Sequence, residues 1–93
     1  MFYLSIEHSV LLILVSVMKM YYPRIRGLRE DADLTQKAVG EAINVPQRTY
    51  AYYESGQRMI PPTVLCALAG FYHTSVDYLV GLTDERKPYP RRR

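Results

Sequence analysis

Leu34–Glu54 reads LTQKAVGEAINVPQRTYAYYE, and this stretch decides the fold of the chain. Apolar residues recur in it at helical spacing on both sides of a joint of three or four residues. A joint this short prevents two helices from lying antiparallel over much of their length. The stretch therefore predicts two short helices that cross steeply.

The first helix of this pair is expected to begin after Thr35, because Thr is a good N-cap. Asn44 stands where the turn needs a left-handed backbone, which Asn tolerates better than any residue except Gly. Gly40 occupies a mid-helix position and costs about 1 kcal/mol of helix propensity relative to Ala. The predicted apolar face comprises Val39, Ala42 and Ile43.

The second helix of the pair is expected to open at Pro46 and to run to about Glu54. Tyr50 and Tyr53, at helical spacing, are predicted to face the core. Gly56 is the predicted C-cap residue that ends the helix.

Helical spacing continues on both sides of this pair, and no alternating run is long enough for a strand. One helix is expected from Pro23, another from Thr63, and a short last one after Thr74 or Ser75. Together with the central pair these give an all-α, five-helix domain over residues 21–83. The remaining residues predicted to face inward are Ile25, Leu28, Ala32, Leu65, Leu68, Ala69, Tyr72, Val76, Leu79 and Val80.

The two ends of the chain differ from this domain. Residues 1–20 contain the apolar run Val10–Met18, which is too short for the roughly 20 residues of a membrane span. It is either an extra apolar helix or the result of a start codon chosen upstream of Met18 or Met20, and we favour the second. Residues 84–93 are charged and contain two prolines, which predicts a disordered basic tail.

Composition excludes several functional classes. The 93 residues carry 12 Lys and Arg against 9 Asp and Glu, for a formal charge of +3. Cys66 has no cysteine partner and lies in an apolar run, which predicts a buried thiol in a reducing, cytoplasmic compartment. No Cys and His cluster suggests a metal, and no constellation of side chains suggests a cofactor or an enzyme.

Residues 22–83 resemble the Cro/repressor-type, XRE-like helix-turn-helix domains. The matching pieces are Leu34-Thr-Gln36, Gln47-Arg48-Thr49, Tyr53-Glu54-Ser55-Gly56 and Ser75-Val-Asp-Tyr-Leu-Val-Gly81. The resemblance implies a five-helix, lambda-repressor-like fold that binds double-stranded DNA, usually as a two-fold dimer. It implies a transcriptional regulator, which we expect to be a repressor that reads the major groove with the helix at about 47–54.

Site residues follow from the same resemblance. It implies base contacts from Gln47, Arg48 and Tyr52, and backbone contacts from Gln36, Thr49, Gln57 and Arg58. Glutamine and arginine suit these roles because they can pair bidentately with adenine and guanine. Arg29 and Glu54 are implied to form a structural salt bridge that fixes the angle of the recognition helix.

Two partner predictions remain. The last helix and the residues after it, Val76, Leu79 and Leu82, are candidates for a homodimer contact. An alternative function is an antitoxin or adaptor of the same fold whose main partner is another protein. The apolar run Val10–Met18 would then be its second interaction surface.

Overall fold

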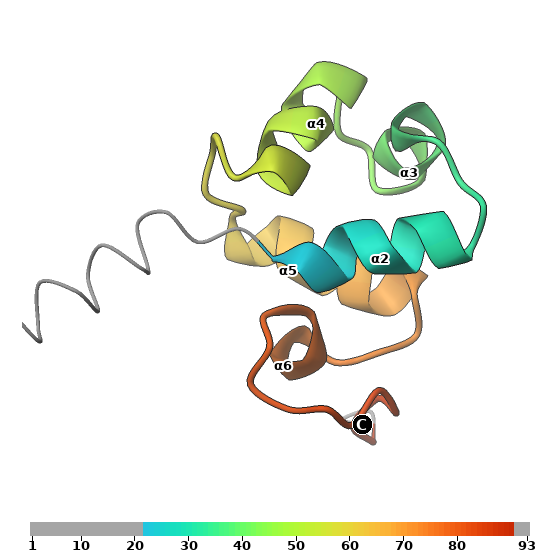
Figure 1. Cartoon of the computed structure of the whole chain (residues 1–93), viewed down its shortest axis with the longest axis vertical. Helices are drawn as coiled ribbons and strands as arrows, with labels where there is room; N and C mark the ends of the chain where they lie inside the picture. Colours follow the sequence, from blue (N-terminus) through green and yellow to red (C-terminus); the bar gives the residue numbers. More distant parts are fainter. Residues whose placement is uncertain (1–21, 91–93) are drawn as a thin grey trace, which may run out of the picture.

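A computed structural model of the chain describes residues 22–90. This part is all-helical and contains no strand. The expected five-helix architecture is therefore confirmed (Figure 1), with the elements α2 (Pro23–Asp31), α3 (Gln36–Ala42), α4 (Gln47–Ser55), α5 (Pro62–Phe71) and α6 (Val76–Leu79). The apolar run Val10–Met18 and the last three arginines lie outside the described residues.

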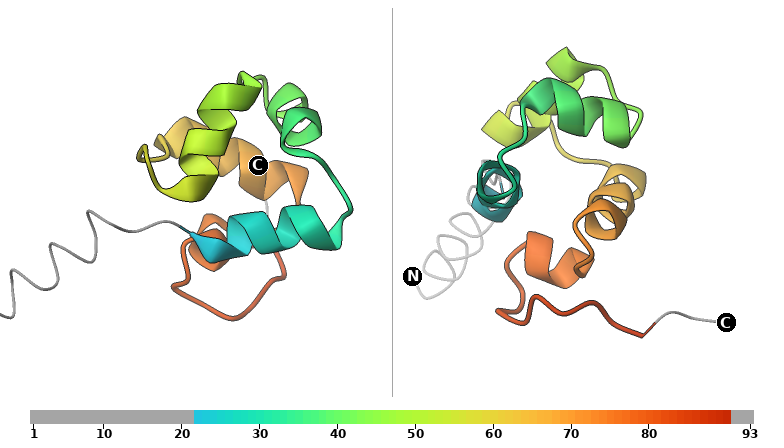
Figure 2. Two further views of the ribbon diagram at one scale, coloured as in Figure 1. Left: turned by 45° about the horizontal axis from the view of Figure 1, so that its top comes forward. Right: turned by 90° about the vertical axis from the view of Figure 1, so that its right-hand side faces the viewer.

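The helices form two tiers: α3 and α4 make the upper tier, and α2, α5 and α6 make the lower tier. In Figure 1, α4 and α3 lie side by side at the top, α2 and α5 run beneath them, and α6 lies at the bottom with the following segment. The right-hand view of Figure 2 shows α2 and α5 end-on, on opposite sides of the space below the α3–α4 pair. The α3–α4 pair therefore packs on the other helices with its inner side and leaves its outer side exposed.

Local sequence sets where these helices begin. The Thr35 hydroxyl accepts a hydrogen bond from the Ala38 amide at 3.0 Å, as expected of an N-cap. Of the two candidate caps for α6, Ser75 has this role, because its hydroxyl accepts from the Tyr78 amide at 3.0 Å. Thr74 instead donates to the Arg86 carbonyl at 2.7 Å.

All five helices end in the same way. A residue with left-handed backbone follows or forms the C-cap, and the next amide donates to the carbonyl five residues earlier. In α3 the left-handed residue is Asn44, at φ 61°, as the sequence predicted. The Val45 amide then donates to the Gly40 carbonyl at 2.8 Å. The other four left-handed residues are Asp33, Gly56, His73 and Gly81.

One hydrophobic core joins the two tiers. Side chains from every helix and from the α4–α5 loop contribute, and Val39, Tyr50 and Leu68 are completely buried. A helix needs a wide apolar stripe to face such a core, and most of the predicted inward positions supply it. The buried set is Ile25, Leu28, Val39, Tyr50, Ile60, Leu68, Ala69 and Leu79.

Four predictions about individual side chains are wrong. Ala32 and Ala42 are exposed, because Ala32 is the C-cap residue of α2 and Ala42 is the last residue of α3, where the chain leaves the core. Cys66 is an exposed free thiol on the outer side of α5. Leu79 is only 1% exposed, so it cannot contact a second subunit, whereas Leu82 is 76% exposed.

Residues 84–90 contact the helices at a few points, and the disorder expected for residues 84–93 stays a prediction. The Tyr89 hydroxyl donates to the Asp77 carboxylate at 2.7 Å. Arg24, at the start of α2, donates to the carbonyls of Tyr78 and Thr83 and pairs with Asp84. These contacts fasten the end of α6 and the segment after it to the lower tier.

Candidate nucleic-acid interface

The turn between α3 and α4 depends on a close backbone approach at Gly40. A Cβ added at this residue would lie 2.7 Å from the Val45 carbonyl oxygen, a distance that real Cβ atoms do not adopt. Neither atom can move freely, because the Val45 amide is hydrogen-bonded to the Gly40 carbonyl. Gly40, which the sequence presented as a weakness of the helix, is therefore what lets α4 approach α3.

The inner side of α4 is fixed in the core. Tyr50 is fully buried and Glu54 is 6% exposed, four residues further along the same face of the helix. Arg48 and Tyr52, four residues apart, lie on the other side of the helix, where Arg48 is exposed and Tyr52 is half-buried, and Gln47 is exposed at the first position of α4. The helix thus presents its N-terminal end and one side to solvent.

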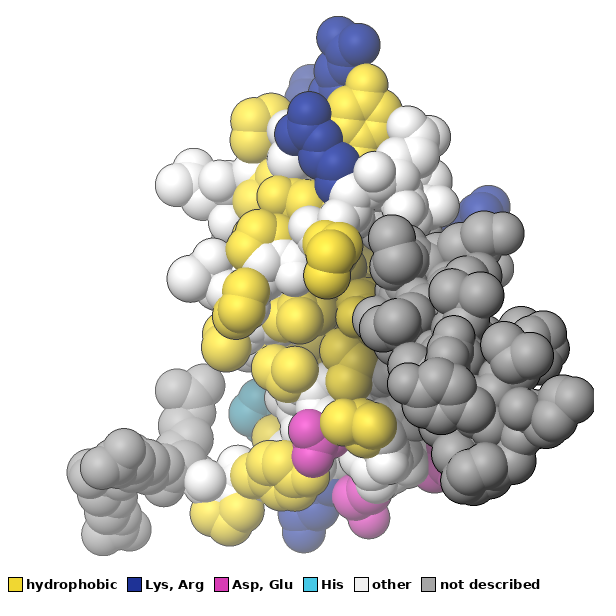
Figure 3. Space-filling model, turned by 90° about the vertical axis from the view of Figure 1, so that its left-hand side faces the viewer, with side chains coloured by type: hydrophobic (Ala, Val, Ile, Leu, Met, Phe, Trp, Pro, Cys, Tyr) yellow, Lys and Arg dark blue, Asp and Glu magenta, His cyan; other side chains and the backbone are white. Residues whose placement is uncertain are grey.

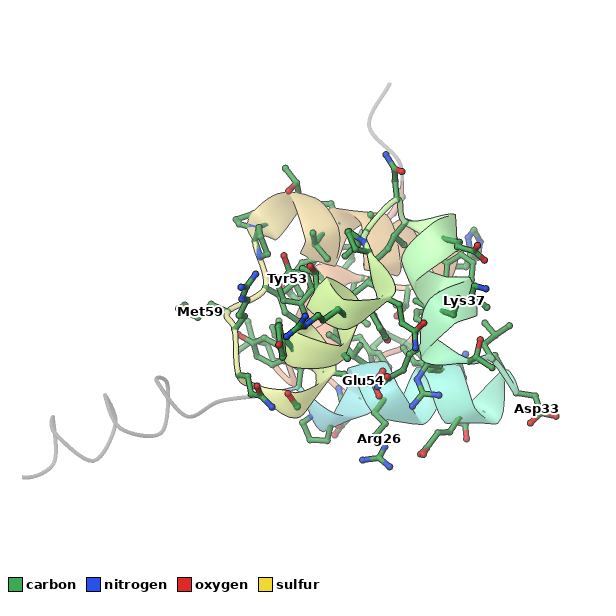
Figure 4. The ribbon with its side chains drawn as sticks, turned by 90° about the horizontal axis from the view of Figure 1, so that it is seen from above. Arg26, Asp33, Lys37, Tyr53, Glu54 and Met59 are labelled. Carbon is green, nitrogen blue, oxygen red and sulfur yellow. The ribbon has the colours of Figure 1, made fainter. Side chains whose placement is uncertain are left out.

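Glu54 joins α4 to α2 through Arg29. Two hydrogen bonds connect them: Arg29 Nε donates to Glu54 Oε2 at 2.9 Å, and Nη2 donates to Oε1 at 2.8 Å. Arg29 also donates from Nη1 to the Leu34 carbonyl at 2.9 Å, which holds the start of the α2–α3 connection. The side chains are 13% and 3% exposed, so water barely reaches the pair. Figure 4 shows Glu54 directed toward α2.

The electrostatics of this pair follow from burial and hydrogen bonding. Burial is the largest single effect and disfavours the Glu54 carboxylate, but the hydrogen bonds from Arg29 and Gln36 and the charge of Arg29 act against it, and the pKa of Glu54 lies below its ordinary value. Hydrogen bonding to Glu54 in turn raises the pKa of Arg29. In the folded protein at neutral pH, Glu54 is therefore ionised and Arg29 is protonated.

Gln36 has a structural partner that sequence reasoning missed. Its side-chain amide donates to Glu54 Oε1 at 3.2 Å and so adds the start of α3 to the Arg29–Glu54 pair. One carboxylate thereby links three helices. The helical spacing within each segment gives no indication of this contact, because its two residues come from different helices.

A cluster of cations and one aromatic ring covers the outer side of α4. Arg48 Nε donates to the Tyr52 hydroxyl at 3.0 Å. The guanidinium of Arg58, in the loop after α4, lies 5.2 Å from the centre of the Tyr52 ring, within cation–π range. Gln57 is exposed in the same loop, and Thr49 is half-buried on α4. The structure thus gathers Arg48, Tyr52 and Arg58 at one place.

Charge is distributed unevenly over the face where this loop lies. Figure 3 shows apolar side chains running down this face, with Lys and Arg side chains gathered at its upper end and further basic atoms at its lower end. The Asp and Glu side chains visible on it lie toward the lower end. The basic side chains at the upper end are thus not mixed with acidic ones in this view, which suits a surface for phosphates.

Two buried tyrosine hydroxyls lie beneath α4. Neither the Tyr50 nor the Tyr72 hydroxyl has a hydrogen-bond partner among the described residues. Burial raises the pKa of Tyr72 to about 12, and it also raises the pKa of Tyr50. Both phenols therefore stay neutral, so the core under α4 carries no charge besides the Arg29–Glu54 pair.

Comparison with known proteins identifies this arrangement of helices. A helix-turn-helix family model matches residues 25–79, from the first turn of α2 to the end of α6. The chain belongs to this helix-turn-helix family. The resemblance to Cro/repressor-type, XRE-like domains is thereby confirmed, and α3 and α4 are the two helices of the helix-turn-helix.

Curated relatives of this helix-turn-helix domain are transcriptional regulators by name. The chain is 38% identical over 74 residues to the uncharacterized HTH-type transcriptional regulator YobD of Bacillus subtilis, covering 80% of this chain and 66% of that protein. It is 31% identical over 64 residues to the HTH-type transcriptional regulator ImmR of Bacillus subtilis, covering 69% and 50%. It is 36% identical over 61 residues to the cryptic phage CTXphi transcriptional repressor RstR of Vibrio cholerae, covering 66% and 55%.

The chain thus spans between half and two thirds of the length of these relatives. No solved structure matches the helix-turn-helix chain significantly.

Within residues 22–90, no helix is long and apolar enough to cross a lipid bilayer.

Proposed function

We propose that this chain is a sequence-specific regulator of transcription that binds double-stranded DNA and represses by occupying its operator. In this proposal α4 enters the major groove. Gln47 and Arg48 contact base edges there, and Gln36, Thr49, Gln57 and Arg58 contact the sugar-phosphate backbone. The protein acts in the cytoplasm, without a cofactor.

The observation that carries the proposal is the orientation of α4. Its inner side is fixed by buried Tyr50 and by the Glu54–Arg29 pair, so the helix cannot rotate about its axis. Its N-terminal end, with exposed Gln47 and Arg48, is left facing outward. A recognition helix contacts base edges with its N-terminal residues, and these two side chains are the types that pair bidentately with purines.

The proposed backbone contacts come from three elements. Gln36 lies at the first turn of α3, Thr49 at the first turn of α4, and Arg58 in the loop after α4. Backbone contacts of this kind fix the register of the helix on the duplex. Because the Gln36 amide already donates to Glu54 at 3.2 Å, its contact with a phosphate would also depend on the Arg29–Glu54 pair.

Two copies of the chain are proposed to bind as a two-fold dimer on half-sites about one helical turn apart. With Leu79 buried, the exposed Leu82 and the half-buried Val76 are what remains of the predicted dimer contact.

Selection of random duplex DNA by the purified protein tests the proposal. Recovery of one enriched motif, with two related half-sites, is the expected result. A variant with Arg48 and Gln47 both changed to Ala is expected to lose that motif while remaining folded. Recovery of no motif above background would overturn the proposed function, and a stoichiometric protein partner would then favour the antitoxin or adaptor alternative.

A further inference from the structure

Tyr52 lies between the two arginines of the proposed interface. Its hydroxyl accepts the hydrogen bond from Arg48 Nε at 3.0 Å. The guanidinium carbons of Arg48 and Arg58 lie 5.8 Å and 5.2 Å from the centre of its ring. The two cations belong to different elements, α4 and the loop that follows it, and Tyr52 is the residue that both of them contact.

The main chain of Tyr52 also holds the loop in place. Its carbonyl accepts hydrogen bonds from the amides of Gln57 and Arg58, at 2.9 Å and 3.3 Å, and from the Ser55 hydroxyl at 3.2 Å. These bonds bring Arg58 back over α4. They involve only the backbone of Tyr52, so they persist when its side chain is changed. The side chain therefore has a separable effect, which is to order the two guanidinium groups.

Ordering matters because arginine side chains have many rotamers, and binding must restrict them. A side chain that already has its bound position loses less free energy when it forms a contact. The hydrogen bond to Tyr52 uses Arg48 Nε, and neither terminal nitrogen of Arg48 donates to any other described residue. Both terminal nitrogens therefore remain available for a base edge or a phosphate.

We propose that Tyr52 is a positioning residue that sets affinity and base preference through Arg48 and Arg58 rather than through a base contact of its own. The hydroxyl orients Arg48, and the ring orients Arg58. This inference rests on the proposed function, in which α4 and the loop after it meet DNA. It replaces the expectation of a direct base contact from Tyr52.

A set of mutant cycles tests this assignment on the duplex selected by the wild-type protein. Tyr52→Phe removes the hydroxyl and keeps the ring, while Tyr52→Leu removes both. Tyr52→Phe is expected to weaken binding about 2- to 12-fold, the cost of ordering one long side chain. In an Arg48→Ala background, Tyr52→Phe should have no further effect. Tyr52→Leu should weaken binding more than Tyr52→Phe, and this additional loss should become smaller in an Arg58→Ala background, since the ring lies near Arg58 as well as Arg48.

A second measurement needs no DNA. Nitrogen-15 relaxation of the Arg48 Nε group should show restricted motion in the free wild-type protein and greater motion in Tyr52→Phe. The thermal unfolding midpoint should be the same for both, because the hydroxyl lies on the outer side of α4. A merely structural role for Tyr52 would move the midpoint and leave the coupling with Arg48 at zero.

The possible results separate the inference from the function on which it rests. Additive losses from Tyr52→Phe and Arg48→Ala would show that Tyr52 contacts DNA independently and would overturn the inference alone. An unchanged affinity of Tyr52→Phe would also overturn it. Failure of the wild-type protein to select any duplex would overturn the proposed function, even if the relaxation of Arg48 Nε changed as expected.

Discussion

The Arg29 guanidinium and the Glu54 carboxylate form two hydrogen bonds, of 2.9 Å and 2.8 Å, which join the last turn of α2 to the last turn of α4. Such a pair adds little net stability, because removing two charges from water offsets their attraction. Its main effect is geometric, because both bonds form only at one orientation of α4 relative to α2. Each partner also becomes costly to remove alone.

Glu54→Gln is expected to lower the free energy of unfolding by about 3 kcal/mol, because it leaves the Arg29 charge buried without a counter-charge. Urea unfolding followed by circular dichroism measures this loss. Glu30→Gln is the matched control, since the Arg26–Glu30 pair joins side chains that are 64% and 55% exposed. That exposed pair should contribute at most about 0.5 kcal/mol. Equal losses from the two variants would contradict the structural role of the buried pair.

Acid should remove the contribution of Glu54 to stability. The folded-state pKa of Glu54 lies below its unfolded value, so the folded state binds its proton less readily. The stabilisation is complete above about pH 4.3, the ordinary glutamate pKa, and is lost as the pH falls through the lower folded value. The gap in unfolding free energy between the wild type and Glu54→Gln should therefore narrow below about pH 4. A gap that is constant across that range would show that the charge of Glu54 has no part in the stabilisation.

Gly40→Ala should destabilise the protein, although alanine is the better helix former. The added Cβ would meet the Val45 carbonyl at 2.7 Å, and the backbone there is held by a hydrogen bond. We expect a loss of about 1 to 3 kcal/mol, as for other overpacked sites. Gly27→Ala in α2 is the control, because its Cβ would meet nothing within 4 Å. Gly27→Ala should raise the free energy of unfolding by about 0.5 to 1 kcal/mol. Stabilisation by both substitutions would mean that the α3–α4 turn can widen to fit the Gly40→Ala methyl group at no cost.

Arg48→Ala is expected to weaken binding to the selected duplex by about 1 to 3 kcal/mol and to relax the preference at one base position. Arg86→Ala removes the same charge from the segment after α6, at the opposite end of the molecule from α4 (Figure 1). It should leave the base preference unchanged. Fluorescence anisotropy with single-base variants of the duplex distinguishes the two. Similar losses on every duplex from both variants would indicate general charge attraction without base recognition.

Much of the fold could be predicted because its signals are local. The N-cap at Thr35 and the left-handed turn at Asn44 each depend on residues within one helical turn, and helical spacing identified most of the core. The exceptions are instructive. Ala32 and Ala42 fit the helical spacing but lie at helix ends, where no other helix packs against the apolar face, and both are exposed.

The contacts that sequence did not reveal join residues far apart in the chain. Nothing around Arg24 indicates that it holds carbonyls more than fifty residues later. The same applies to Gln36, whose partner lies on α4. Gly40 shows a different limit of prediction from sequence. The helix propensity of glycine does not depend on tertiary neighbours, so only the close approach of the Val45 carbonyl shows why glycine is required here.

Four of the nine residues of α4 form two pairs with different neighbours. Tyr50 and Glu54 are buried, whereas Gln47 and Arg48 are exposed, and Arg48 contacts Tyr52 on the outer side of the helix. Substitutions in the second pair leave the packing of the first untouched, and surface changes of this kind usually alter stability by less than about 0.5 kcal/mol. A lineage that carries this domain can therefore exchange its outward side chains one at a time, and acquire new binding preferences, without passing through an unfolded intermediate sequence.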